Sequence, residues 1–164
     1  MAVDEEFTEF AAARAGRLRE IAFLMCGDWH QAQDLTQQTL TKVYVSWRRI
    51  RSRENVDAYA RRVLLRELLN ERRLRRSTER PVAAVPETPA VSGDPDLRLT
   101  LLQALATIPP KRRAVIILRY WDDHSVERVA EIMQLSIGAV KSLTVRGLAD
   151  VRAALDAELP ITHV

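Results

Sequence analysis

Apolar residues recur with a helical period along two stretches of this chain, residues 1–76 and 97–159. In both stretches they return every three or four positions, and neither stretch contains a convincing period-2 run that would predict a strand. The segment between them, STERPVAAVPETPAVSGDPD at 77–96, carries four prolines and has no amphipathic period. We therefore predict an all-α protein with two small helical domains, 1–76 and 97–159, joined by a proline-rich linker at 77–96.

The first domain is predicted to contain three helices. Gly27 is placed to end the first one, because glycine tolerates the left-handed backbone common at helix ends. Asp28, with Gln31 three residues later, predicts a capping box at the start of the second. Asn55 or Asp57 is placed to cap the third helix, along which four arginines fall close to one line: Arg62, Arg66, Arg73 and Arg76.

The second domain is predicted to contain four helices. Pro109 and Pro110 end the first of them and preset the start of the next. Ser125 is placed to cap a short helix that follows, and Ser136 to cap a longer one that reaches Leu159.

The last two helices, with the sequence VAEIMQLSIGAVKSLTVRG at 129–147, have the pattern of a helix-turn-helix. Ala130 supplies the small residue that a steep helix crossing needs, but Gln134 stands at the corner where glycine is frequent, which predicts some strain. An ordinary helical hairpin is the alternative. A set of residues on the outer side of the second helix suits base edges and phosphates: Gly138, Lys141, Ser142, Val145 and Arg146.

Charge is concentrated in the middle of the chain. Residues 41–80 hold 13 Lys and Arg against five Asp and Glu, whereas residues 1–40 hold three against seven and residues 81–164 hold nine against ten. A concentrated basic segment suits a polyanion, because each neutralised phosphate releases counterions and so contributes affinity. A solvated arginine-rich helix is the alternative.

Composition excludes several classes of protein. The single cysteine, Cys26, allows no intramolecular disulfide, and His30, His124 and His163 are too scattered to form a zinc site, so we expect no metal and no cofactor. The N-terminus MAVDEEF is acidic, unlike a signal peptide, and no apolar run approaches the roughly 18 residues that cross a bilayer. We therefore expect a cytoplasmic protein without membrane insertion.

Three segments together resemble the extracytoplasmic-function sigma factors of bacterial RNA polymerase, most closely the short subfamily common in actinobacteria. They are GDWHQAQDLTQQTLTKVYVSW at 27–47, ENVDAYARRVL at 54–64 and LATIPPKRRAVIILRYWDDHSVERVAEIMQLSIGAVKS at 105–142. Their order and spacing are far more specific than any one of them alone. The resemblance implies a promoter-specificity subunit that binds core polymerase, recognises two promoter elements and nucleates DNA melting.

By this resemblance, the helix around residues 32–47 docks on the clamp helices of the largest polymerase subunit through Asp34, Leu35, Gln37 and Gln38. The family usually has glutamate where this chain has Gln33 and Gln38, which predicts weaker electrostatic docking, although amides still bond arginine side chains. The alternative is that these amides only solvate the helix.

The resemblance also implies that the third helix and the loop before it open the promoter and hold the minus-10 element as a single strand. Arg66 stands where asparagine is typical of the family and Asn70 where aspartate is frequent. The resemblance therefore does not determine which minus-10 sequence this chain recognises. The residues expected to bind this strand are Arg51, Ser52, Arg53, Asn55, Arg61, Arg62, Arg66, Asn70 and Arg73.

The second domain resembles the one that reads the minus-35 element. Leu143 stands where arginine is usual, which predicts looser reading at this end; alternatively, Leu143 completes the helix-turn-helix core. The residues expected to bind this element are Arg112, Arg113, Ser136, Gly138, Lys141, Ser142 and Arg146.

Two other functions compete with the sigma factor. One is a helix-turn-helix regulator that binds duplex DNA without polymerase core, against which the seven arginines between residues 56 and 76 argue. The other is an enzyme, which needs a nucleophile or a cluster of acids that the sequence does not offer, since Asp122 and Asp123 favour a turn over a metal pair. The resemblance admits an anti-sigma factor as a partner, and the short linker equally allows autoinhibition by packing of the two domains.

Overall fold

A computed structural model describes residues 2–50, 55–75 and 93–158 of the chain. Every regular element within these ranges is helical, so the predicted fold class is confirmed. The elements are α1 (Val3–Cys26), α2 (Trp29–Val45), α3 (Trp47–Ile50), α4 (Val56–Arg75), α5 (Pro95–Thr107), α6 (Pro110–Ile116), the π-helical turn η2 (Ile117–Trp121), α7 (Val126–Met133) and α8 (Ile137–Glu158).

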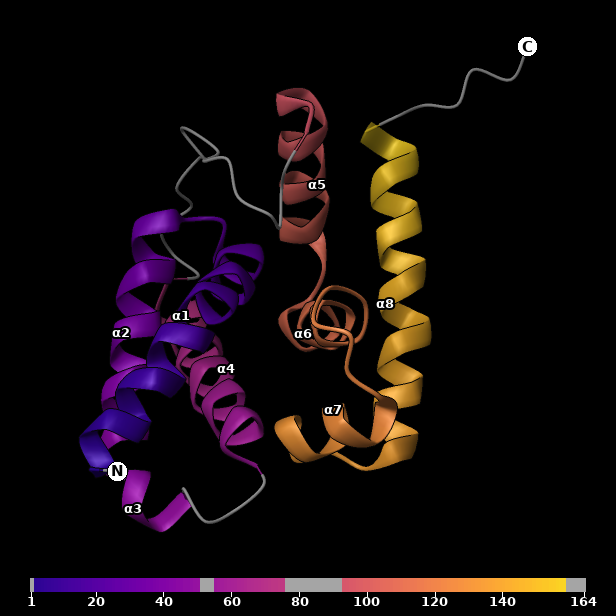
Figure 1. The fold of residues 1–164 in the computed structure, drawn as a ribbon. Helices are drawn as coiled ribbons and strands as arrows, with labels where there is room; N and C mark the ends of the chain where they lie inside the picture. Colours follow the sequence, from indigo (N-terminus) through magenta and orange to yellow (C-terminus); the bar gives the residue numbers. More distant parts are fainter. Residues whose placement is uncertain (1, 51–54, 76–92, 159–164) are drawn as a thin grey trace.

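The first helix set is built from α1, α2 and α4, which pack on one another (Figure 1). The end of α1 and the start of α2 follow the sequence signals. Gly27 takes the left-handed conformation with φ 72°, and its N–H donates to the carbonyl of Phe23. The Asp28 carboxylate then accepts the N–H of Gln31 at 3.0 Å, so the predicted helix end at Gly27 and the predicted N-cap at Asp28 are confirmed.

The second helix set follows its predicted caps as well. The Ser125 hydroxyl accepts the N–H of Arg128 at 3.1 Å, and the Ser136 hydroxyl accepts the N–H of Ala139 at 3.1 Å. Between α7 and α8, Gln134 has φ 55° and ψ 48°, the left-handed backbone predicted for the corner. The helix after Pro110 differs from expectation only in its last turn, which widens into η2.

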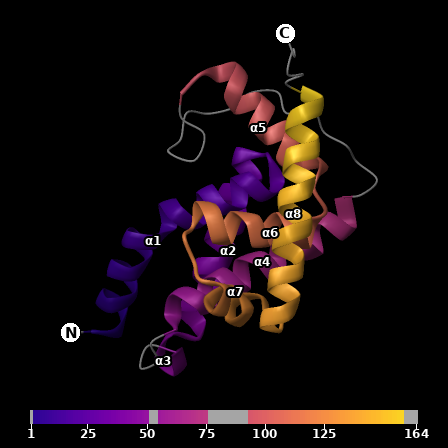
Figure 2. The same cartoon turned by 90° about the vertical axis from the view of Figure 1, so that its right-hand side faces the viewer.

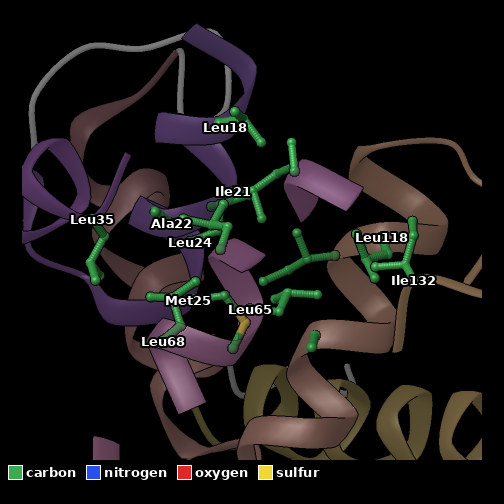
Figure 3. Packing of buried hydrophobic residues seen from close by; sticks show 14 of the residues in the cluster. Leu18, Ile21, Ala22, Leu24, Met25, Leu35, Leu65, Leu68, Leu118 and Ile132 are labelled. Atoms are coloured by element: carbon green, nitrogen blue, oxygen red, sulfur yellow. The ribbon is translucent and has the colours of Figure 1, made fainter. Parts of the chain in front are cut away.

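The two helix sets share one hydrophobic core. Helix α4 packs against α7, and α1 packs against α5, α6 and η2. Figure 3 shows part of this core, in which the labelled residues come from both sets, Met25 and Leu65 from the first and Leu118 and Ile132 from the second. In Figure 2, α8 lies in front of α6 and α7, on the side of the molecule away from α2. The described parts of the two domains are therefore packed together.

Candidate functional site

The outer face of α2 is polar and exposed. Asp34, Gln37 and Gln38 all lie on it, as their spacing along the helix requires. Leu35 does not belong to this face, because it is only 1% exposed and packs in the core. Its expected contact with polymerase is thus corrected: Leu35 falls on the inward stripe of the helix and holds the polar face in place.

The two consecutive arginines of α4, Arg61 and Arg62, are turned toward the second domain. Arg61 is 6% exposed and its guanidinium forms a two-pronged pair with the carboxylate of Asp122, with Nη2 3.1 Å from Oδ1. Arg62 donates from Nη2 to the main-chain carbonyl of Glu131 at 3.0 Å. The DNA-backbone contact expected for Arg61 is therefore absent from this conformation, because a protein carboxylate already binds its guanidinium.

The other residues predicted to bind the minus-10 strand are distributed differently. Arg66 and Asn70 are exposed on α4. Asn55, immediately before α4, accepts a hydrogen bond at Oδ1 from Nη1 of Arg128 at 2.9 Å, so its amide also faces the second domain. Outside the described residues or side chains lie Arg51, Ser52, Arg53 and Arg73.

Asp122 of the second domain contacts two arginines of the first domain and a histidine close to it in sequence. Its side chain is 3% exposed and lies against Arg61 of α4 and, at 3.8 Å, against Nε of Arg17 on α1. His124 Nε2 lies 2.6 Å from Oδ2 of the same carboxylate. The Arg17 guanidinium also lies 5.1 Å from the ring centroid of Trp121, within the range of a cation–π interaction. One carboxylate thus joins α1, α4 and the turn after η2.

The environment of Asp122 favours its ionised form. Burial alone would raise the pKa of this carboxyl, but hydrogen bonds from His124 and Arg61, with the charges of both groups, lower the pKa below its ordinary value. A lowered pKa in the folded state stabilises that state above the ordinary carboxyl pKa, and this stabilisation is lost as pH falls through the lowered value. At neutral pH the interface therefore contains a full negative charge facing Arg61.

The outer face of α8 carries the residues predicted to read DNA. Five of them are exposed: Ser136 at the cap, then Gly138, Lys141, Ser142 and Arg146. Val140 is fully buried and Leu143 packs against the core from the inner side of the helix. The position of Leu143 fits the alternative in which it completes the helix-turn-helix core.

The adjacent arginines of α6 have opposite surroundings. Arg112 is half-buried and pairs with Asp150 of α8 at 2.9 Å, near the surface. Arg113 is only 2% exposed, which corrects the expected phosphate contact, because its guanidinium is turned into the protein. That guanidinium donates to the main-chain carbonyl oxygens of Met25, Ala106 at 3.0 Å and Ile108 at 2.7 Å.

Sequence reasoning missed the role of Asp122. It placed a turn at Asp122 and Asp123, and Asp123 indeed has φ 56°. The ion pair to Arg61 links residues 61 positions apart, so no local pattern could have indicated it. The sequence contains only a weaker signal for this role. Asp122 follows directly on the mostly apolar stretch that ends at Trp121, so its carboxylate is expected close to the core, where it needs a cationic partner.

Comparisons with known proteins match both halves of the chain. Residues 10–78 match the family model described as Sigma-70 region 2, and residues 98–151 match the one described as Sigma-70, region 4. The chain is also 36% identical to the RNA polymerase sigma-E factor of Streptomyces coelicolor over 92% of this chain and 86% of that protein. The chain belongs to the extracytoplasmic-function sigma factors of bacterial RNA polymerase.

Further relatives agree with this membership and with the actinobacterial type. The sigma factor is 29% identical to the ECF RNA polymerase sigma factor SigE of Mycolicibacterium smegmatis, over 88% of this chain and 59% of that protein. Its fold matches that of the sigma factor RpoE, solved in complex with the anti-sigma factor NepR from Bartonella quintana. That match has a TM-score of 0.77 and 25% identity, and covers 93% of this chain and 98% of that chain. The protein is thus a transcription initiation factor.

Two structural observations complete the description of the site. Among the residues that the structure describes, none of the helices is both long and apolar enough to cross a membrane. Within the same residues, His, Cys, Asp and Glu side chains form no group of three or more that could hold a metal ion.

Proposed function

We propose that this sigma factor divides its work between a polymerase-docking face on α2, a strand-binding face on α4 and the loop before it, and a duplex-reading face on α8. Residues 1–76 then form the domain that binds core polymerase and the minus-10 element, residues 77–96 the linker, and residues 97–159 the domain that reads the minus-35 element. The observation that carries this proposal is the match of the two halves to sigma regions 2 and 4, in that order.

The outer face of α2 is suited to a basic partner helix. Asp34 offers a carboxylate, and Gln37 and Gln38 offer amide oxygens, all of which accept hydrogen bonds from arginine side chains. Buried neighbours on the opposite side of α2 fix the direction of these groups. We therefore propose that the partner is the pair of clamp helices of the largest polymerase subunit.

The arginines of α4 supply the charge that a melted strand needs. A strand-binding surface combines cations that follow the phosphates with groups that hold a base outside the stack. Arg61, Arg62 and Arg66 are proposed to bind the backbone, and Asn55, at the end of the preceding loop, an extruded base. In α8, Lys141 and Arg146 are proposed to contact the minus-35 duplex.

These roles require no covalent chemistry, so we propose that the protein is not an enzyme. Because its work is done on RNA polymerase, we propose that it acts in the cytoplasm. An anti-sigma factor is proposed as a further partner, since the similar RpoE structure contains one.

The proposal is tested by asking whether purified core polymerase and the sigma factor co-elute on size exclusion. Wild type is expected to co-elute and Asp34→Arg to fail, because the substituted arginine repels a basic clamp helix. Asp156→Arg is the matched control: it makes the same charge change at an exposed position of α8 and is expected to co-elute like wild type. Failure of folded, inhibitor-free wild type to bind core would overturn the proposed docking, as would equal binding by the two variants.

A further inference from the structure

One apolar side chain lies among the polar groups on the outer face of α8. Val145 is 70% exposed, although valine is usually buried and is a poorer helix former than lysine or arginine. Figure 2 shows α8 at the surface of the molecule, in front of α6 and α7. The helices that the structure describes therefore leave most of this side chain uncovered.

The position of Val145 puts it inside the reading face of α8. Residues three or four positions apart in a helix lie next to each other on one side. Val145 follows Lys141 by four positions and Ser142 by three, and Arg146 comes directly after it. All three neighbours are exposed, and their side chains suit base edges and phosphates. Val145 is thus surrounded by groups that suit contact with DNA.

The inner side of α8 fixes the direction in which Val145 projects. Val140 and Gly147 are buried, and Leu143 packs against the core. These three residues share one side of the helix, and Val145 lies on the opposite side. Because a β-branched side chain has one strongly preferred rotamer in a helix, the methyl groups of Val145 are held in one place.

Thymine is the base whose edge fits this side chain. In the major groove thymine presents a C5 methyl group beside its O4 acceptor, and the other three bases lack this methyl group. Valine offers methyl groups and no hydrogen-bonding group. It therefore gains by burying the thymine methyl, and it is unfavourable against a base whose donor or acceptor it would cover.

We propose that Val145 determines a preference for thymine at one position of the minus-35 element, by packing on the C5 methyl group of that base. Lys141 and Arg146 bind phosphates or neighbouring base edges, and Val145 selects the base between them. The inference rests on the proposed role of α8 in reading the minus-35 duplex.

The test removes methyl groups from the protein and from the DNA. Holoenzymes are prepared with wild-type, Val145→Ala and Leu148→Ala sigma factor, and each is purified by size exclusion before DNA is added. Leu148 is the control because it is a 42% exposed apolar side chain of the same helix, beyond the polar groups of the reading face. Alanine is the better helix former at both positions, so neither substitution is expected to unfold α8.

Wild-type holoenzyme first selects duplexes from a library randomised over both promoter elements, which defines the minus-35 element. Each thymine of that element is then replaced singly by deoxyuridine, which lacks only the C5 methyl group. At one thymine, wild type and Leu148→Ala should lose about fourfold in affinity, the effect of one buried methyl group. Val145→Ala should bind the thymine and deoxyuridine duplexes equally well at that position, because the two methyl contacts are coupled.

The possible results separate this inference from the proposed function. If no upstream element is selected, α8 does not read DNA, and the role of Val145 is overturned with it. If an element is selected but no thymine in it depends on Val145, only the role of Val145 is overturned. The role is equally overturned if Leu148→Ala removes the thymine preference as fully as Val145→Ala, because the loss then comes from α8 as a whole.

Discussion

At the scale of single residues, Gly147 determines how closely α8 approaches α6. A β-carbon at this position would lie 2.7 Å from Cγ1 of Ile116 and 3.3 Å from the main-chain oxygen of Arg112. The first distance is well inside van der Waals contact, and Ile116 is itself buried. The absent side chain of Gly147 is therefore part of the packing between the two helices.

Gly147→Ala is expected to lower the free energy of unfolding by about 1–3 kcal/mol, because the added methyl group overpacks this contact. Urea unfolding followed by circular dichroism measures the change. Gly16→Ala is the control: Gly16 lies within α1, a β-carbon added there would have no neighbouring atom within 4 Å, and the variant should gain about 0.5–1 kcal/mol from helix propensity. A stabilised Gly147→Ala protein would contradict the assigned packing.

At the scale of elements, α7 ends at the corner of the helix-turn-helix in a left-handed residue that is glutamine and not glycine. The N–H of Gln134 donates to the carbonyl of Ala130, and the chain then turns into Ser136, which caps α8. Gln134 supports the left-handed conformation at a cost, because its β-carbon crowds the backbone there. The cap is satisfied, but the residue that forms it is strained.

Gln134→Gly is expected to raise the free energy of unfolding by about 0.5–1 kcal/mol, since glycine relieves this crowding but gains entropy in the unfolded chain. Thermal unfolding provides the measurement. Gln134→Ala keeps the β-carbon and should not stabilise the protein. If alanine and glycine had the same effect, side-chain loss rather than backbone strain would be the cause.

At the scale of the whole molecule, Arg113 connects the two domains through the interior. Its guanidinium reaches the carbonyl of Met25 at the end of α1 and those of Ala106 and Ile108 in the second domain. Carbonyl groups at helix ends lack the partner that a helix interior would supply, and the guanidinium donates hydrogen bonds to three of them. A buried arginine side chain thus links the two domains by hydrogen bonds inside the shared core.

Arg113→Met is expected to lower the free energy of unfolding by about 3–5 kcal/mol, because it leaves buried carbonyl groups without their donor. Arg112→Met, one residue earlier, removes a partly exposed ion pair to Asp150 and should cost less than about 1 kcal/mol. Urea unfolding of both variants separates the two cases. If the two variants lost similar free energies of unfolding, the burial of Arg113 would not be the reason for its contribution to stability.

Much of the fold could be predicted because its signals are local. Gly27, Ser125 and Ser136 act on backbone groups within three or four positions, so the sequence around each one contains both the donor and the acceptor. The corner at Gln134 is local in the same way. The exposed faces of α2 and α8 follow from helical periodicity, since a polar stripe opposite a buried one faces solvent.

The sequence by itself determined the main helices, the caps at Gly27, Asp28, Ser125 and Ser136, the family, and the exposed polar faces of α2 and α8. Only the tertiary structure decided which arginines face solvent, because an arginine beside an apolar stripe has the same local pattern whether its partner is water, a phosphate or a distant carboxylate. Arg61 and Arg113 are buried because residues far along the chain, Asp122 and Met25, are brought to them by the packing of the two domains. Long-range packing therefore determines the state of the strand-binding surface.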